Sequence, residues 1–184
     1  MTNDAPLDVR VRDEQPSDHE AVFGVVERAF ESPGEARLVA RLRDVAEPWI
    51  SLVAEAEGRV VGHVSFSPVM IVGSHEAAGG EAPGATTAIG LAPLAVDPPC
   101  QKRGVGSALV REGLARCRAI GEELVFVLGS PAYYGRFGFQ FAAPLGLHFQ
   151  GPQFDPHFML VELLPGALRE RRGEVRYHPL FDEL

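Results

Sequence analysis

Residues 101–107 carry the groups that first suggest chemistry: two cations, two glycines and a hydroxyl, in the order Gln101-Lys102-Arg103-Gly104-Val105-Gly106-Ser107. An apolar run at 91–96 precedes them, two prolines follow that run, and a helix is expected from 107 onward. The first N–H groups of a helix have no intrahelical partner and carry partial positive charge, so a phosphate group binds well there. Glycines also let an anion approach the backbone closely. The stretch therefore predicts a phosphate-binding loop between a strand and a helix.

The spacing of these glycines excludes two common phosphate-binding motifs. The dinucleotide fingerprint needs a third glycine three positions after Gly106, where this chain has Leu109. The P-loop needs Gly-Lys-Ser/Thr, which the chain lacks. A nucleotide-binding protein is therefore disfavoured, and a plain structural turn is the simplest alternative interpretation.

The stretch resembles the acyl-CoA-binding motif of the GNAT superfamily of N-acetyltransferases, an apolar strand followed by Val-x-Pro and then Gln/Arg-x-x-Gly-x-Gly/Ala. The chain reads Val96-Asp97-Pro98 and then Gln101 to Gly106 at these positions. A second resemblance lies at 134–139, which is similar to the Tyr-x-x-x-Gly-Phe end of the family's aromatic helix. The resemblance covers about residues 9–141, and 142–184 are expected to be a variable extension of the same single domain, 1–184.

The resemblance implies an α/β (α+β) fold with a mixed, mostly antiparallel sheet, helices on both faces, and two central strands, 91–96 and 124–128, that splay apart. Sequence patterns independently predict strands and helices along the chain. The strands are expected at 7–12, 50–56, 60–72, 87–96, 124–128, 158–164 and 175–177. The helices are expected from a capping box at 17–20 to a break at 32–34, at 35–43, at 107–120, and from 131 to Gly138. Residues 73–86 are expected to form a mobile surface loop, and 169–172 a solvated helix face.

The resemblance also implies how acetyl-CoA is held, because open sheets bind ligands where neighbouring strands diverge. The backbone of Leu94, Ala95 and Val96 would border the pantetheine arm. The N–H groups of 102–107, with Gln101 before them, would hold the pyrophosphate. Pro93 implies a bulge that frees the Leu94 N–H to polarise the acyl carbonyl. Arg136 is expected either to meet the 3′-phosphate or to be an exposed cation.

The implied reaction is direct transfer of an acetyl group from acetyl-CoA to an amine in a ternary complex. The leaving thiolate benefits from a proton donor, and Tyr134 stands where many relatives keep that donor. The alternative is that Tyr134 is a half-buried core aromatic with a satisfied hydroxyl. Cys100 adjoins the loop, but a nucleophilic role is disfavoured because no partner histidine is evident and the family does not use one there.

The general base is open at this stage. Many relatives carry a glutamate on the central strand, whereas residues 89–96 contain no acid here. His63 on the long strand, Glu31 between the first two helices, and a water molecule are the three candidates. The competing interpretations are that His63 is a surface or satisfied strand histidine and that Glu31 is a solvated loop charge.

Composition limits the partners that the chain is expected to have. Its 184 residues carry 17 basic and 25 acidic side chains, a net charge of −8, which disfavours nucleic acid and is compatible with an amine acceptor, small molecule or peptide. Two cysteines form neither a disulfide framework nor a metal site, and we expect no signal peptide, no membrane span and a cytoplasmic location. The resemblance also allows a homodimer. The alternative function is a non-catalytic acyl-CoA-binding sensor or regulatory module.

Overall fold

The computed structural model describes residues 5–73, 85–169 and 171–184, which fall into two compact units. Unit 1 comprises Met1–Ser67, Ala92–Arg116 and Pro179–Leu184, and unit 2 comprises Pro68–Leu91 and Cys117–His178. The strands β3 (Arg59–Val72) and β4 (Ala85–Val96) and the helix α3 (Val105–Ala119) contribute residues to both units. Each unit has its own core.

In unit 1, the strand order is β1 (Arg10–Asp13), β2 (Ile50–Ala56), β3 and β4. The pairs β1–β2 and β2–β3 are antiparallel, and their register places Val53 opposite His63 and Ser51 opposite Ser65. The end of β4 is tied to β3 by the Asp97 N–H, which donates to the Val61 carbonyl at 2.9 Å.

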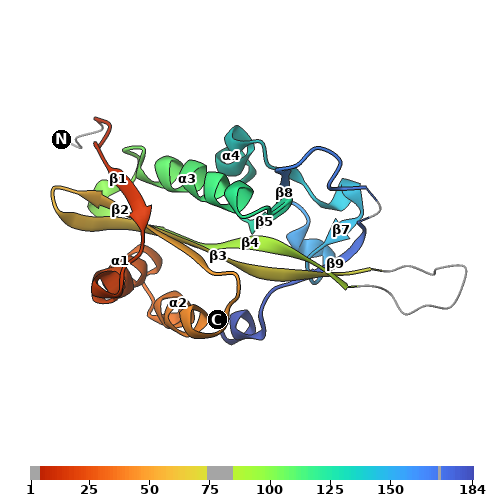
Figure 1. Ribbon diagram of the computed structural model, residues 1–184, viewed down its shortest axis with the longest axis horizontal. Coiled ribbons are helices and arrows are strands. Elements are labelled where there is room, and N and C mark those ends of the chain that lie inside the picture. The colour runs from red at the N-terminus through yellow and green to blue at the C-terminus, as the bar shows by residue number, and fades with distance from the viewer. Residues whose placement is uncertain (1–4, 74–84, 170) are drawn as a thin grey trace, which may run out of the picture. The chain divides into compact units, whose positions relative to one another are not determined.

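Helices cover both faces of the strands of unit 1 (Figure 1). On one face, α1 (His19–Phe30) and α2 (Gly34–Val45) bury an apolar stripe against Val53 and Ala95. On the other face, α3 packs so closely that glycines are needed. A Cβ on Gly62 would lie 2.9 Å from Val105, and a Cβ on Gly113 would overlap the ring of Phe66. The predicted arrangement of helices on both faces is therefore confirmed for this unit.

The end of the chain also belongs to unit 1. The short 3-10 helix Pro179–Glu183 packs Leu180 and Phe181 against an apolar cluster that includes Leu38 and Leu42 of α2. An ion pair between Arg41 and Glu183 adds to this contact. The sequence alone predicted no role for this segment, and the structure shows that it covers α2.

In unit 2, β5 (Leu124–Leu128) lies between β4 and β8 (Phe158–Glu162). β5 runs parallel to β4 and pairs with it only at Ile89 and Gly90 among the described residues. The β5–β8 and β8–β6 pairs are antiparallel, with β6 at Gln140–Phe141. β9 (Gly173–Arg176) pairs antiparallel with β3 and parallel with β7 (Leu147–His148). These pairings confirm the predicted mixed, mostly antiparallel sheet.

The core of unit 2 consists of apolar side chains from its strands and from the segments that follow β6. Stacked Phe126 and Phe158 rings lie at its centre, with centroids 5.5 Å apart. After β5, the short helix α4 (Pro131–Tyr134) continues into a 3-10 turn, and Gly138 ends that turn with a φ of +89°. A helix that ends at Gly138 was predicted, and the structure places Tyr133, Tyr134 and Phe137 on the helical segment before it.

Three local predictions differ from the structure. At the start of α1, the Asp18 carboxylate accepts from the Gln15 N–H at 2.8 Å, in place of a capping box formed by Ser17 and Glu20. Helix α3 begins at Val105, two positions before the prediction, directly after the left-handed Gly104. Residues 165–169 form turns, so the predicted helix face at 169–172 is wrong in its described part. Most of the predicted loop at 73–86 lies outside the described residues.

Candidate active site

The predicted phosphate loop begins where β4 ends. A 3-10 turn at Pro98–Cys100 follows Asp97, and residues 101–104 form a tight turn before the first residue of α3. Two positions in this turn are left-handed, Lys102 with φ +60° and Gly104 with φ +90°. These conformations redirect the chain so that the turn leads straight into the helix N-terminus. The backbone therefore forms the strand, turn and helix start that the sequence predicted.

Side chains of the loop fix its two ends. The Gln101 side chain donates to the Val96 carbonyl at 3.1 Å, which ties the turn to the end of the strand. Arg103 Nε donates to the Ala5 carbonyl, and the Arg103 carbonyl accepts from the Leu7 N–H, both at 3.0 Å. Through these hydrogen bonds, Gln101 and Arg103 stabilise the shape of the loop.

The space beside the loop is suited to an anion. A Cβ on Gly104 would meet no atom within 4 Å, so the backbone is open to a ligand at this point. Lys102 is exposed, and the N–H groups of the first turn of α3, from Val105 to Ser107, lie at the positive end of the helix dipole. This donor set fits the pyrophosphate of CoA.

The strand before the loop carries the backbone groups expected to hold the pantetheine arm and the acyl oxygen. Ala95 is buried against α1 and α2, whereas Leu94 and Val96 are half-buried. The Ala92 carbonyl accepts from the Ser65 hydroxyl at 2.9 Å, so a serine on β3 anchors the strand next to Pro93. The role of the Leu94 N–H stays a prediction.

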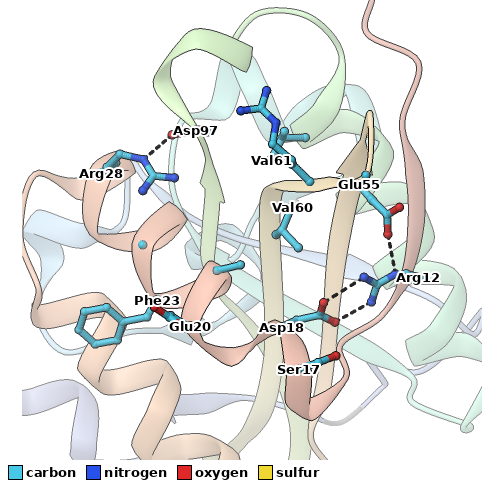
Figure 2. Close-up of a pocket in the computed structure, with 14 residues that line it drawn as sticks. Arg12, Ser17, Asp18, Glu20, Phe23, Arg28, Glu55, Val60, Val61 and Asp97 are labelled. Atoms are coloured by element: carbon cyan, nitrogen blue, oxygen red, sulfur yellow. Dashed lines mark hydrogen bonds and ion pairs between the residues drawn. The ribbon is translucent and has the colours of Figure 1, made fainter.

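A pocket of about 800 Å³ lies in unit 1 beside α1 and the β2–β3 turn (Figure 2). Five of its charged side chains form ion pairs: Arg12 contacts Asp18 at 2.6 Å and Glu55 at 3.0 Å, and Arg28 contacts Asp97 at 2.7 Å. The pairing with Arg12 holds the pKa of Asp18 below its usual range. The Arg28–Asp97 pair also ties α1 to the residue that begins the phosphate loop. The pocket therefore borders the start of the predicted phosphate loop.

Tyr134 lies in unit 2, at the end of α4, and only 8% of its surface is exposed. Its ring packs edge-on against Tyr133 and Phe139, and a Cβ on Gly129 would overlap it. Burial, with a smaller contribution from Tyr133, raises the pKa of Tyr134 above its ordinary value. The phenol therefore keeps its proton at neutral pH, as a proton donor must.

Arg136 is an exposed cation on the same turn. Its Nε donates to the Tyr133 carbonyl at 3.0 Å, and its guanidinium lies 4.3 Å from the centre of the Tyr133 ring. The charge is held in place and left open to solvent. This geometry is compatible with both interpretations of Arg136 from the sequence, a 3′-phosphate ligand or an exposed cation.

Tyr177 is a residue of unit 2 that the sequence analysis assigned only to a strand. Its ring occupies the space beside Gly90, where a Cβ would lie 2.5 Å from Tyr177 Cε1 and 2.7 Å from Val69 Cγ1. Gly90 is the last described β4 residue paired with β5. Burial, with a smaller contribution from Tyr134, raises the pKa of Tyr177 above its ordinary value. A lone tyrosine near the end of a strand gave no signal for this position in the sequence.

Of the three candidates for the base, two can be placed. Glu31 ends α1 in a left-handed conformation with φ +55°, and its side chain is exposed. His63 is completely buried on β3, which excludes a surface histidine. Its Nε2 lies 2.8 Å from the Ser51 hydroxyl. Burial lowers the pKa of His63 to about 4, with opposing contributions from Glu14 and Arg43, so the ring is neutral at pH 7.

Two further features bear on the site. Within residues 5–73, 85–169 and 171–184, no group of three or more His, Cys, Asp or Glu side chains is placed to hold a metal ion. Among the helices described, none is both long and apolar enough to cross a bilayer.

Comparison with known proteins identifies the family. The family model described as "Acetyltransferase (GNAT) domain" matches residues 10–142. The Escherichia coli K12 protein named "Uncharacterized N-acetyltransferase YhbS" is 37% identical over 173 residues, which cover 94% of this chain and 98% of that protein. The match confirms the resemblance that the loop and the aromatic helix indicated.

Solved structures agree with the sequence match. The crystal structure of Escherichia coli YhbS in complex with CoA superposes with a TM-score of 0.83 at 36% identity, covering 99% of this chain and 96% of that chain. A GNAT family acetyltransferase from Brucella melitensis in complex with acetyl-CoA gives a TM-score of 0.73 at 33% identity, covering 95% and 99% of the two chains. Because the family model matches residues 10–142 and these relatives share both sequence and fold with nearly the whole chain, the chain belongs to the GNAT family and is an N-acetyltransferase.

Proposed function

We propose that this N-acetyltransferase moves an acetyl group from acetyl-CoA to an amine by direct attack within a ternary complex. The observation that carries the proposal is the open, left-handed turn at 101–104 leading into the N-terminus of α3. Two relatives with this fold bind CoA and acetyl-CoA in their crystal structures. The acyl donor supplies a thioester, whose carbon accepts the amine and whose sulfur leaves.

In this proposal the residues of the loop bind the donor. The N–H groups of 102–107 hold the pyrophosphate, and Lys102 adds a full positive charge beside them. Gln101 and Arg103 keep the turn in shape through the hydrogen bonds described above. Arg136 contacts the 3′-phosphate. The backbone of Leu94, Ala95 and Val96 aligns the pantetheine arm as a neighbouring strand would.

Two groups act on the reacting atoms. The Leu94 N–H donates to the acyl oxygen as negative charge develops there, a contribution typically worth about 3–4 kcal/mol in the barrier. Tyr134 gives its phenolic proton to the departing sulfur. The phenol is protonated at pH 7, and burial makes it a weaker acid than an ordinary tyrosine, so the role is supported by the position of Tyr134 in the aromatic motif and not by its pKa.

The acceptor is a primary amine of a small molecule or a peptide, and we place the reaction in the cytoplasm. The net charge of −8 favours a cationic acceptor over an anionic one. Cys100 and Cys117 are both free thiols, which supports a reducing compartment.

The proposal is tested by measuring CoA release from acetyl-CoA with a panel of amines, peptides and aminoglycosides. Wild type, Tyr134→Phe and Gly104→Glu are compared, and CoA affinity is measured for each. We expect Tyr134→Phe to lose turnover while keeping CoA affinity, and Gly104→Glu to lose both. Tight binding of acetyl-CoA with no release above hydrolysis for any acceptor would contradict the enzyme and favour a sensor.

A further inference from the structure

A chain of hydrogen bonds runs through the buried side chains on the α1–α2 face of unit 1. Glu14 Oε2 accepts from the Ser51 hydroxyl at 2.6 Å, and Ser51 Oγ lies 2.8 Å from His63 Nε2. Arg43 from α2 clamps the other end, with one N–H 2.6 Å from Glu14 Oε1 and Nε 3.3 Å from Oε2. The chain thus connects a charged pair to a completely buried imidazole.

Proton counting assigns the tautomer of His63. Glu14 is paired with Arg43 as a carboxylate and can only accept hydrogen bonds, so the single hydroxyl proton of Ser51 points to Glu14. Ser51 Oγ must then accept from His63, which places the ring proton on Nε2. Nδ1 therefore carries a free lone pair, which faces away from Ser51 because the two ring nitrogens point in different directions.

That lone pair has no hydrogen-bond partner among the described residues, although the His63 side chain is completely buried. Buried polar atoms in native proteins are nearly always paired, so an unpaired one calls for an explanation such as a catalytic role. Burial is the main reason that the ring is neutral at pH 7, since it lowers the pKa of His63 to about 4, and the nearby charges of Glu14 and Arg43 act in opposite directions. The pKa of about 4 makes the ring by itself a weak base, so a proton taken up at Nδ1 is held only if the Nε2 proton passes on to Ser51.

The position of His63 along β3 places it beside the reactive part of β4. Two residues before it, the Val61 carbonyl accepts from the Asp97 N–H, and two residues after it, the Ser65 hydroxyl donates to the Ala92 carbonyl. His63 thus stands next to residues 93–96, the stretch that includes Leu94. All of these contacts lie within unit 1.

We propose that His63 Nδ1 is the general base of the acetyl transfer and that Ser51 and Glu14 form the relay behind it. The proposal rests on the proposed function. It assigns the role that an acid on the central strand would otherwise fill, since residues 89–96 contain none. Arg43 is a positioning residue that holds the Glu14 carboxylate toward Ser51.

The proton balance of the step closes. As the amine nitrogen bonds to the acyl carbon, one N–H proton passes to Nδ1, directly or through one water molecule. The Nε2 proton then passes to Ser51 Oγ, and the Ser51 hydroxyl proton passes to Glu14 Oε2. The C–S bond breaks and the sulfur takes its proton from Tyr134. After the products leave, the Glu14 proton returns to Ser51 Oγ, the proton that Ser51 received returns to Nε2, and Nδ1 releases the amine's proton to solvent, which reprotonates the Tyr134 phenolate. All four groups then regain their starting states.

The first test is kinetic and uses the acceptor found with the amine panel. We expect His63→Gln, Ser51→Ala and Glu14→Gln each to lower kcat by about 10²-fold, with the KM for acetyl-CoA unchanged. Val53→Ala is the matched control because Val53 lies opposite His63 on the same buried face without joining the relay. It should lower thermal stability and keep kcat within about twofold of wild type.

The second test separates a base from a structural residue. In His63→Gly, added imidazole should restore turnover, and a series of substituted imidazoles should restore it in proportion to their basicity. Nitrogen NMR of the wild-type imidazole should show a protonated Nε2 and an unprotonated Nδ1 at pH 7, independently of any turnover.

The outcomes are distinct. A folded His63→Gln with wild-type kcat overturns the relay, as does a loss of kcat that imidazole does not restore, or an Nδ1–H tautomer. Wild type that binds acetyl-CoA and acetylates no amine refutes the proposed function itself, and the relay falls with it. Wild-type turnover that is lost in Tyr134→Phe but kept in His63→Gln refutes the relay alone.

Discussion

Replacing His63 with glutamine should change how the stability of the protein depends on pH. In the folded protein burial lowers the pKa of His63 to about 4, whereas an unfolded histidine titrates near its ordinary value of 6.5. Between these two values the unfolded chain binds a proton that the folded chain rejects, so stability falls as pH falls from 6.5 toward 4. Glutamine does not titrate, and the variant should lack this component.

The size of the effect follows from the difference between the two pKa values. One pH unit corresponds to about 1.4 kcal/mol, so the whole interval is worth roughly 3 kcal/mol, of which about 2.5 kcal/mol is lost by pH 4.5. No discount for solvent screening applies because the side chain is completely buried. The advantage of wild type over His63→Gln in unfolding free energy should therefore shrink by about 2.5 kcal/mol between pH 7.5 and 4.5.

Urea denaturation at closely spaced pH values measures this difference, and Trp49, the single tryptophan of the chain, reports on unit 1. The carboxyl groups that titrate in the same range are present in both proteins and cancel in the comparison. His157→Gln, at an exposed histidine, is the control and should run parallel to wild type. A stability difference that stays constant from pH 7.5 to 4.5 would refute the buried, neutral state of His63.

Three further predictions test other parts of the structure. Gly113→Ala should lower the melting temperature, because the overlap of the new methyl group with the Phe66 ring costs about 1–3 kcal/mol, more than the gain in helix propensity of at most about 1 kcal/mol. An unchanged melting temperature would contradict this packing. Gly104→Ala should destabilise by about 1–2 kcal/mol through its left-handed φ alone, since the space around it is open; urea unfolding measures this, and no loss would contradict the turn geometry. Iodoacetamide should label half-buried Cys100 in the folded protein and Cys117 only after denaturation, because burial raises the pKa of the Cys117 thiol to about 12. Labelling is measured by mass spectrometry, and equal rates at the two cysteines would argue against the burial of Cys117.

Local sequence patterns predicted most of the regular elements. β2 and β5 have the predicted bounds, because each is an apolar run ended by turn residues. The short strands β6 and β7 were missed, since a two-residue strand has no periodicity of its own and forms only because a neighbour offers hydrogen bonds. The error at the start of α1 has a similar cause, because Arg12 draws the Asp18 carboxylate into an ion pair.

For the candidate site too, sequence patterns indicated some of its residues and missed others. The loop at 101–107 and Tyr134 lie within contiguous motifs, so the resemblance to the family was enough to name them as candidates. The hydrogen-bond chain at His63 was beyond the reach of local patterns. Ser51 on β2 meets His63 on β3 across 12 positions of sequence, and Glu14, which follows β1, meets Ser51 across 37. Tyr177 was missed for the same reason, since only tertiary packing places it beside Gly90.

Among the residues that the structure describes, three aromatic rings pack directly against glycines: Phe66 on Gly113, Tyr134 on Gly129, and Tyr177 on Gly90. Such pairs restrict which substitutions the protein can accept at these positions. A methyl group gained at the glycine is harmful while the ring is present, and a ring exchanged for a small side chain leaves a void. Each position therefore changes safely only when its partner changes too. Gly90→Ala combined with Tyr177→Leu should be more stable than the sum of the single changes indicates, and among diverging relatives positions 90 and 177 should vary as a pair.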